Sequence, residues 1–229
     1  MNALDEIFDK YDTIICLDTE TTGLDELKNQ IIDLGVIEMK RINGTLVETT
    51  TINDLIKLKD KDSKLPIEIT ELTHITDDML NQNGLEMDVV KEKFASLLKK
   101  SGKKIIATYN AQFDLKFLRY FLRGVQLADI SFLDIMTVYK DRRSYPHKLC
   151  VAVSEYKLDD LVANTHRALD DTRACFEVLK SMSLEKHDID SYINLFGYNE
   201  KYGIPTPQIK GVTYKPQSNT ANLDKPLYK

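Results

Sequence analysis

Four apolar runs predict strands in the first half of the chain. "TIICLDTE" at 13–20 is apolar and then polar, which is typical of a buried strand that ends near solvent. "QIIDLGVIEMKRI" at 30–42 and "TLVETTTIN" at 45–53 are joined by the dipeptide "NG" at 43–44, which predicts a tight hairpin turn. These segments predict three antiparallel strands, and "KKIIATYN" at 103–110 predicts a fourth strand.

Helical spacing of apolar residues predicts helices over most of the remaining chain up to residue 182. A short helical or turn-rich stretch comes first, and the later segments place apolar residues on one helical face. The predicted helical segments are 67–80, 88–100, 111–122, 130–140, 156–163 and 167–182. Because strands come first and helices then alternate with strands, the sequence predicts an α/β fold with a mixed sheet flanked by helices.

The end of the chain has a different composition. "HDIDSYINLFG" at 187–197 predicts one more helix, but the residues after it hold four of the six prolines and are expected to lack a core of their own. We therefore divide the chain into a domain at 1–186 and a C-terminal helix with a proline-rich extended tail at 187–229. Residues 197–229 carry five lysines and two acidic residues. This tail is interpreted as flexible, as docked on the domain or on a partner, or as a contact for a nucleic-acid strand.

Composition restricts the possible classes of function. A hydrophobic content of 42% over 229 residues is enough for a core. No apolar run is long enough to span a membrane, and the N-terminus is acidic where a signal peptide would be basic and then apolar. We therefore expect a cytoplasmic protein without a membrane partner. The three cysteines show no C-x-x-C spacing, so neither a disulfide nor a zinc site is expected.

Charge is unevenly distributed along the chain. The net charge of −5 argues against broad attraction to a nucleic-acid duplex, so any contact with nucleic acid has to be local. The stretch "KDRRSYPHK" at 140–148 is locally basic. It is interpreted either as a contact for phosphates or as a solvated loop.

Acidic residues stand where the pattern predicts buried structure. Asp18 and Glu20 lie on the same side of the first predicted strand, roughly 6 to 7 Å apart. They are interpreted as ligands of a divalent metal ion or as a solvated strand end. Asp114 falls in the first turn of an apolar helix, where an acid is also a normal partner of the helix dipole.

Two more acids open the last predicted helix, and His166 stands just ahead of them. If all three residues are helical, Asp170 lies about 40° from His166 around the helix axis and Asp171 lies about 140° from it. A histidine followed by acids is therefore present, but the partner of the histidine depends on where the helix begins.

Three of these segments together resemble a known family. "DTETTG", "NAQFD" and H-x-x-x-x-D, in this order, are similar to the motifs of the DEDDh group of the DnaQ-like 3′-to-5′ exonucleases, which includes the proofreading epsilon subunit of bacterial DNA polymerase III. The resemblance spans residues 13 to 182 and extends to "IIDLGVIE" and "ITELTHIT". It implies a ribonuclease H-like fold, with a mixed five-stranded sheet flanked by helices.

The resemblance also implies the catalytic residues. Two Mg²⁺ or Mn²⁺ ions are expected, held by four acids: Asp18, Glu20, Asp114 and Asp171. The family spacing makes Asp170 an acid at the start of the helix. It also places His166 in the loop before the helix, as the general base. A free imidazole titrates near neutral pH, which suits this role.

The family pattern further implies residues that seat the 3′-terminal nucleotide. These are Thr19, Thr21, Gly23, Leu24, His74 and Asn110, with Leu24 as a wedge against the last base. The chain departs from many relatives at Tyr109, where they have histidine, and this is expected to alter contacts to the terminal nucleotide.

The expected function is therefore 3′-to-5′ hydrolysis of single-stranded or frayed DNA ends to nucleoside 5′-monophosphates, in proofreading, repair or replication. One alternative is an RNA-directed exonuclease of the same family. Another is a non-catalytic binding subunit of a polymerase or repair partner. Oligomeric state stays open.

Overall fold

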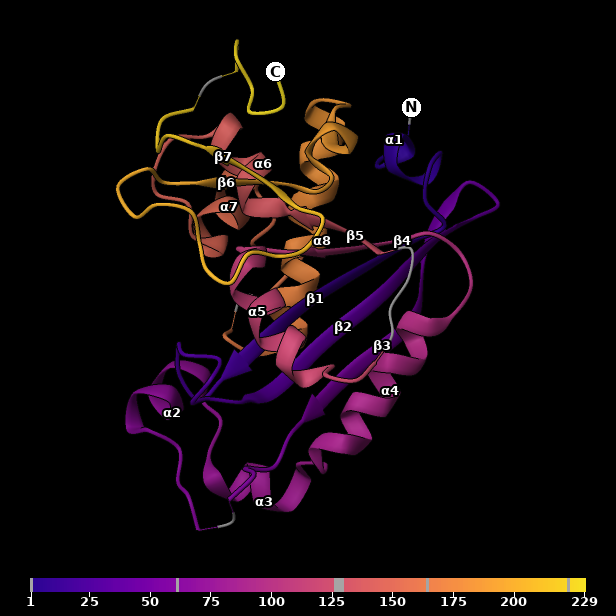
Figure 1. Ribbon diagram of the computed structural model, residues 1–229. Coiled ribbons are helices and arrows are strands. Elements are labelled where there is room, and N and C mark those ends of the chain that lie inside the picture. Colours follow the sequence, from indigo (N-terminus) through magenta and orange to yellow (C-terminus); the bar gives the residue numbers. More distant parts are fainter. Residues whose placement is uncertain (1, 61, 126–129, 164, 222) are drawn as a thin grey trace.

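The fold is built on a five-stranded sheet with the strand order β3-β2-β1-β4-β5 (Figure 1). The computed structural model describes residues 2–60, 62–125, 130–163, 165–221 and 223–229. β1 pairs antiparallel with β2 and parallel with β4, while β3 and β5 form the edges. The strands are Thr13–Thr21 (β1), Ile31–Ile42 (β2), Thr45–Leu55 (β3), Lys104–Thr108 (β4) and Ile130–Asp134 (β5). The prediction of a mixed sheet flanked by helices is confirmed.

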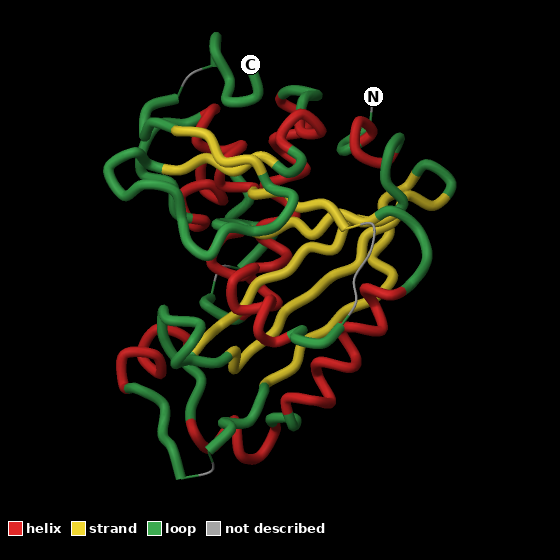
Figure 2. Tube along the Cα trace, viewed as in Figure 1, coloured by secondary structure: helices red, strands yellow, loops and turns green. Residues whose placement is uncertain are grey.

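Helices pack against both faces of this sheet, as the tube in Figure 2 shows. α4 and α5 share a core with Ile15 and Leu17 of β1, whereas α8 and α6 share a core with Ile14 and Cys16, because successive side chains of a strand point to opposite faces. In the described part of the chain, no helix is both long enough and apolar enough to cross a membrane. The helices are Asp5–Phe8 (α1), Ile67–Thr73 (α2), Asp77–Asn83 (α3), Met87–Lys99 (α4), Ala111–Phe121 (α5), Ile135–Arg142 (α6), Leu149–Glu155 (α7) and Ala168–Glu185 (α8).

The central strand β1 has one partly unpaired end. Its pairing with β4 stops at Cys16, whereas its pairing with β2 continues to Thr21. Asp18 and Glu20 therefore lie where β1 has left β4, on the same side as Cys16 and facing the layer of α8. The topology thus places both acids at an open end of the sheet.

Two predicted helical segments were wrong or only partly right, and the stretch at 67–80, expected to be helical or rich in turns, has both features. Residues 130–140 form β5 and then α6, because the short apolar run pairs with β4 and Asp134 caps the new helix by accepting from Met136 N. Residues 156–163 form turns, and the helix α7 lies just before them. Residues 67–80 divide into α2 and α3, since His74 adopts a left-handed backbone with φ of 59°. Short apolar runs do not distinguish strands from helices, and parallel pairing joins residues far apart in the sequence.

The C-terminal segment also differs from its prediction. The helix expected at 187–197 is replaced by a single 3₁₀ turn at Ile189–Tyr192 and the strand β6 at Leu195–Tyr198. β6 pairs in parallel with β7 at Thr213–Pro216. Phe196 and Ile209 are buried in the same core as the apolar residues of α5. The segment thus adds a second, small sheet to the body of the domain.

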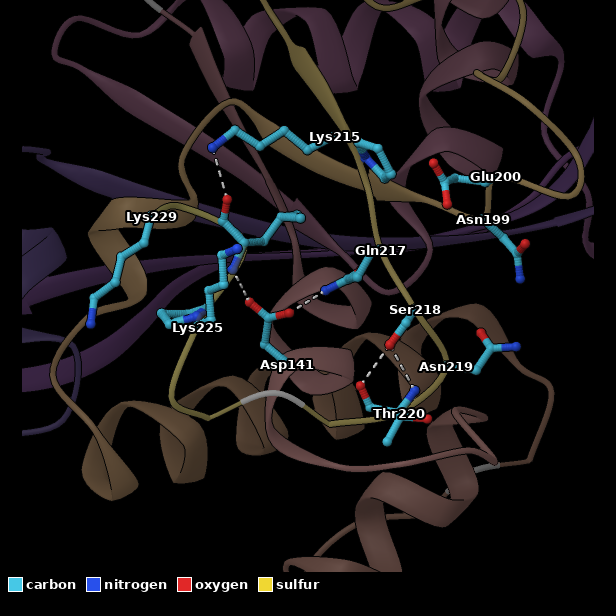
Figure 3. A pocket seen from close by; sticks show the side chains of 13 residues that line it. Asp141, Asn199, Glu200, Lys215, Gln217, Ser218, Asn219, Thr220, Lys225 and Lys229 are labelled. Carbon is cyan, nitrogen blue, oxygen red and sulfur yellow. Dashed lines mark hydrogen bonds between the residues drawn. The ribbon is translucent and has the colours of Figure 1, made fainter.

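Polar contacts hold this segment against α6. Gln217 Nε2 donates to Asp141 Oδ1 at 2.7 Å (Figure 3). It also donates to Thr137 O at 2.8 Å. The backbone N–H of Leu227 donates to the other carboxylate oxygen of Asp141. A cavity of about 630 Å³ lies between these residues and the end of the chain. The carboxylate of Asp141 therefore binds the C-terminal segment to α6.

The basic stretch at 140–148 is largely engaged inside the protein. Arg142 is buried and donates to Asp188 Oδ1 at 2.6 Å, and Arg143 donates to Glu185 Oε1 at 2.9 Å. His147 is also buried. The two arginines thus join α6 to the end of α8, where phosphates would have to displace their carboxylate partners.

Truncation after Gly197 is expected to lower the melting temperature by about 10 °C or more. It removes Ile209 from the core and leaves buried Asp141 without its partners Gln217 and Leu227. A loss of about 1 kcal/mol shifts the melting temperature by about 2–4 °C in a domain of this size, and several such contacts are lost. Thermal unfolding monitored by circular dichroism measures the shift. Tyr202→Ser, at a site that is 78% exposed in the same segment, is the control, and an unchanged melting temperature of the truncated chain would contradict the prediction.

Candidate active site

Two acids of β1 face a group of other carboxylates. Burial raises the pKa of Asp18 well above its ordinary value, and the nearby charges of Asp114 and Glu20 raise it further. Burial likewise raises the pKa of Glu20 to about 8, and the charge of Asp171 adds to the effect. Carboxylates that raise one another's pKa in this way lie close together without enough positive charge between them.

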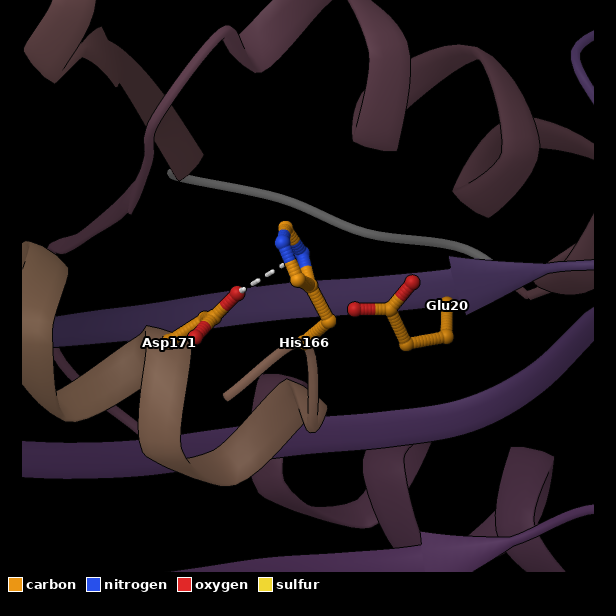
Figure 4. Close-up of side chains that lie close together, drawn as sticks. All are labelled: Glu20, His166 and Asp171. Atoms are coloured by element: carbon orange, nitrogen blue, oxygen red, sulfur yellow. Dashed lines mark ion pairs between the residues drawn. The ribbon is translucent and has the colours of Figure 1, made fainter. Parts of the chain in front are cut away.

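His166 and Asp171 reach the same place from the start of α8. The helix begins at Ala168, so Asp171 lies in its first turn and is buried, while His166 lies in the loop before it. His166 Nδ1 is 4.0 Å from Asp171 Oδ2, and one ligand atom from each of Glu20, His166 and Asp171 lies within 4.8 Å of the other two (Figure 4). In this view the imidazole ring stands between the two carboxylates.

The neighbouring acid of the same helix has another partner. Asp170 Oδ2 accepts a hydrogen bond of 2.7 Å from the hydroxyl of Thr165. The helix start at Ala168 explains the difference, since His166 is not helical and the angular comparison between the two acids does not apply. The structure therefore brings Asp171 to Glu20 and His166.

Asp114 comes to the cluster from the other face of the sheet, in the first turn of α5. It is buried, and its Oδ1 accepts from the N–H and the hydroxyl of Thr19, at 3.1 and 2.7 Å. Its Oδ2 accepts from the Thr108 hydroxyl at 2.8 Å. Burial raises the pKa of Asp114 to about 7, although these hydrogen bonds oppose the shift. Both of its oxygens are thus engaged by threonines, while its charge acts on Asp18.

Of the residues predicted to seat a nucleotide, Thr19 and Thr21 lie at the end of β1, and Gly23 and Leu24 lie in the loop that follows it. The Thr21 hydroxyl donates to Gly23 O at 2.7 Å and shapes the loop after β1. Leu24, at the tip of that loop, is 78% exposed, and its carbonyl accepts from Lys116 Nζ of α5 at 2.6 Å. The loop therefore presents an exposed apolar side chain on an anchored backbone.

Two further predicted binding residues flank helices. His74 ends α2 and Asn110 precedes α5, both with a left-handed backbone and both exposed. The hydroxyl of Thr19 donates its hydrogen bond to Asp114, as described above. The ring of Tyr109 is buried, and its hydroxyl donates to His147 O at 3.0 Å. Tyr109 is thus engaged in the core, and the expected change in contacts to a terminal nucleotide has no support in these contacts.

Asp33 and Arg167 were not predicted. Asp33 lies on β2 directly opposite Glu20, and its Oδ2 accepts from Arg167 Nε at 2.9 Å. The positive charge of Arg167 lowers the pKa of Glu20, against the effect of the surrounding acids. The feature of the sequence by which Asp33 could have been found is an acid in the otherwise apolar run "IIDLG".

The donor set fits hard divalent cations. The oxygens of Asp18, Glu20 and Asp171 are the ligand type that Mg²⁺ and Mn²⁺ prefer. Burial and then the charges of neighbouring carboxylates raise the pKa values of Asp18 and Glu20, and a bound cation would favour their ionised forms. The residues therefore fit a divalent metal centre.

Sequence comparisons relate this chain to an exonuclease family and to DNA polymerase III proteins. A profile of the family described as Exonuclease matches residues 15–179. "DNA polymerase III PolC-type" of Clostridium perfringens is 31% identical over 206 residues, which cover 88% of this chain and 13% of that protein. "DNA polymerase III subunit epsilon" of Treponema pallidum is 28% identical over 172 residues, which cover 72% of this chain and 74% of that protein. The chain thus spans only a small part of the PolC-type relatives.

Solved structures share the fold. E. coli Exonuclease I in complex with a dT13 oligonucleotide matches with a TM-score of 0.65 and 18% identity, over 79% of this chain and 43% of that chain. The nuclease domain of 3′hExo, a DEDDh family member bound to rAMP, matches with a TM-score of 0.61 and 22% identity, over 78% of this chain and 95% of that chain. The predicted ribonuclease H-like fold is confirmed by these neighbours, and the resemblance to an exonuclease family is confirmed by the matching profile.

Proposed function

The chain belongs to the exonuclease family, and we propose that it hydrolyses nucleic acids from their 3′ ends, with divalent metal, to nucleoside 5′-monophosphates. One observation carries this proposal. Glu20, Asp171 and His166 come from separate elements and offer ligand atoms within 4.8 Å of one another, beside Asp18. Acidic ligands with a nearby base are the groups that metal-assisted phosphodiester hydrolysis requires.

We assign the metal ligands and their chemistry as follows. Asp18, Glu20 and Asp171 hold two Mg²⁺ or Mn²⁺ ions, and Asp114 supports them through its charge and the Thr19 backbone. When bound, such ions stabilise the negative charge that develops on the phosphate oxygens and lower the pKa of a water molecule. Asp114 is suited to a supporting role because threonine donors occupy both of its oxygens.

His166 takes the proton from the attacking water in this proposal. Its side chain is 51% exposed, so a ring nitrogen is accessible to a water on the substrate side. The carboxylate of Asp171, 4.0 Å from Nδ1, stabilises the imidazolium that forms. The proton can then pass to solvent, which the exposed ring contacts.

The loop residues bind the end of the strand. The anchored loop after β1 holds Leu24 against the terminal base, and Gly23, His74 and Asn110 contact the sugar and phosphate. Single-stranded or frayed ends are the expected substrates, because a chain with a net charge of −5 lacks the positive surface that grips a duplex.

DNA is the substrate that the relatives favour, since those reported above are DNA polymerase III proteins and one structural neighbour was solved with a DNA oligonucleotide. A role beside a replicative or repair polymerase follows from the same names. RNA is the second candidate, because the 3′hExo nuclease domain was solved with rAMP. A non-catalytic binding role is disfavoured, since closely spaced carboxylates are unfavourable without a cation.

The proposed activity is tested on matched DNA and RNA oligonucleotides with a 5′ label. With Mg²⁺ or Mn²⁺ we expect a ladder that shortens from the 3′ end, release of 5′-monophosphates identified by chromatography, and no cleavage after chelation with EDTA. A 3′-phosphate is expected to slow the reaction strongly, and a closed circular single strand is the negative control. Cleavage of the circle would identify an endonuclease, and inactivity on every free end would support the binding role.

A further inference from the structure

The buried acid Asp33 binds the residues at the start of α8. Asp33 is 0% exposed and lies in the register position opposite Glu20. Its Oδ2 accepts from Arg167 Nε at 2.9 Å and from the backbone N–H of Ala168 at 3.3 Å. One carboxylate oxygen thus holds both the residue before the helix and the first residue of the helix.

A second contact fixes the same turn of α8 on β2. Gly35 lies two residues after Asp33, and a Cβ atom there would collide with the backbone of Ala168 and Leu169. The hydroxyl of Thr172 donates to Gly35 O at 3.1 Å. The first turn of α8 therefore packs closely on β2 at Gly35. Asp33 holds the backbone at the point where this helix begins.

His166 is the residue that this entry point controls. It directly precedes Arg167 and has a φ of 54°, which is an unfavourable backbone for a residue other than glycine. Its ring nitrogen Nδ1 lies 4.0 Å from Asp171 Oδ2. Its position therefore depends on the backbone held by Arg167, because strained conformations persist only where the surroundings fix them.

We propose that Asp33 and Arg167 are a positioning pair that holds His166 at the catalytic cluster. This inference rests on the proposed function, because it assumes that His166 takes the proton from water. Neither residue touches the reacting atoms. The Asp33–Arg167 ion pair fixes the backbone on one side of His166, and Asp171 orients the ring from the other side.

Asp33→Asn tests the pair without leaving a buried unpaired charge. We expect kcat to fall by about 10-fold or more, in the range of effects seen when a catalytic base is misplaced. KM and the affinity for Mn²⁺ measured by calorimetry should stay unchanged. The control is Glu48→Gln, which breaks the exposed pair between Glu48 and Arg173 of the same helix. A weakened Mn²⁺ affinity would instead make Asp33 a metal ligand and overturn the proposal.

Variants of Arg167 provide the conservative comparison. Arg167→Gln removes the cation, and we expect a loss of kcat similar to that of Asp33→Asn. Arg167→Lys keeps a positive charge that can reach Asp33 and should recover part of that loss. If Arg167→Lys were as impaired as Arg167→Gln, while Asp33→Asn were fully active, the ion pair would have no positioning role.

A double-variant comparison shows whether the pair acts through His166. In a His166→Ala background, adding Asp33→Asn should cause no further loss of kcat, because the group being positioned is absent. An additional 10-fold loss in that background would place the effect elsewhere and contradict the proposal.

An experiment independent of turnover separates this inference from the proposed function. The imidazole signals of the four histidines can be followed by NMR, with His166 assigned from the spectrum of His166→Ala. Asp33→Asn should shift or broaden the His166 signal and leave the other three in place, even if no substrate is hydrolysed. An unchanged His166 signal would refute the positioning role.

Discussion

Asp18→Asn is expected to abolish hydrolysis and, in the metal-free protein at pH 8, to raise the melting temperature by several degrees. Burial raises the pKa of Asp18 most, and the charges of four other acids raise it further: Asp114, Glu20, Asp171 and Asp33. Removing its charge therefore relieves the repulsion at the centre of the cluster. The same change removes a carboxylate ligand that the proposed metal centre requires, so activity and stability should move in opposite directions.

The pH dependence of this stabilisation follows from the direction of the pKa shifts. The pKa values of Glu20 and Asp114 are raised to about 8 and about 7 in the folded protein, whereas free carboxyl groups titrate near pH 4. The folded state then binds protons more tightly than the unfolded state. The contribution of these two carboxyl groups to the stability of the folded protein is fully present below about pH 4 and is lost as pH rises towards 8. The rise in melting temperature caused by Asp18→Asn should accordingly be small at pH 5 and largest at pH 8.

Melting temperatures measured at pH 5 and pH 8, with and without Mg²⁺, test this directly. Mg²⁺ should stabilise the native protein at pH 8 and have less effect on Asp18→Asn. Asp170→Asn is the matched control, since this acid lies beside Asp171 but bonds to Thr165, and it should stay active. If Asp170→Asn were inactive and Asp171→Asn active, the alignment of the third motif would be wrong. A metal-free Asp18→Asn protein that melts lower than the native protein at pH 8 would contradict the proposed repulsion.

Local sequence patterns predicted the parts of the fold that depend on local physics. The hairpin across residues 43–44 and the strand ending in Glu20 follow from alternation and turn chemistry, and the structure has both. The strand at 130–134 was missed, because its identity depends on pairing with β4, which the short apolar run itself does not reveal. The tail was expected to lack a core of its own, yet its few apolar residues reach the core of the domain, as Ile209 does.

In the candidate site too, local motifs identified some residues and missed those that depend on tertiary packing. The motifs named Glu20, His166 and Asp171, and the structure places them together, although their catalytic roles stay predictions. Asp33 and Arg167 lie 134 positions apart in the sequence. Either one alone is an ordinary charged residue, and only the packing of α8 on β2 shows that they form a pair. A motif identifies residues that perform chemistry more easily than residues that hold them in place.

His166→Ala is expected to lower turnover by roughly 10² to 10⁴, the usual contribution of a general base, while Mn²⁺ binding measured by calorimetry persists. His166→Asn should behave similarly, because an amide cannot take a proton from water. In the native enzyme the rate should fall when the ring of His166 is protonated, since only the neutral ring accepts a proton, and this pH dependence should be absent from the variant. The matched control is His187→Ala, which removes a histidine that contacts Glu6, 3.5 Å from Nδ1, outside the cluster, and should leave the profile unchanged. A His166→Ala enzyme that is slow but keeps the native pH dependence would show that another group accepts the proton, and His166 would then be a residue that only contacts the substrate.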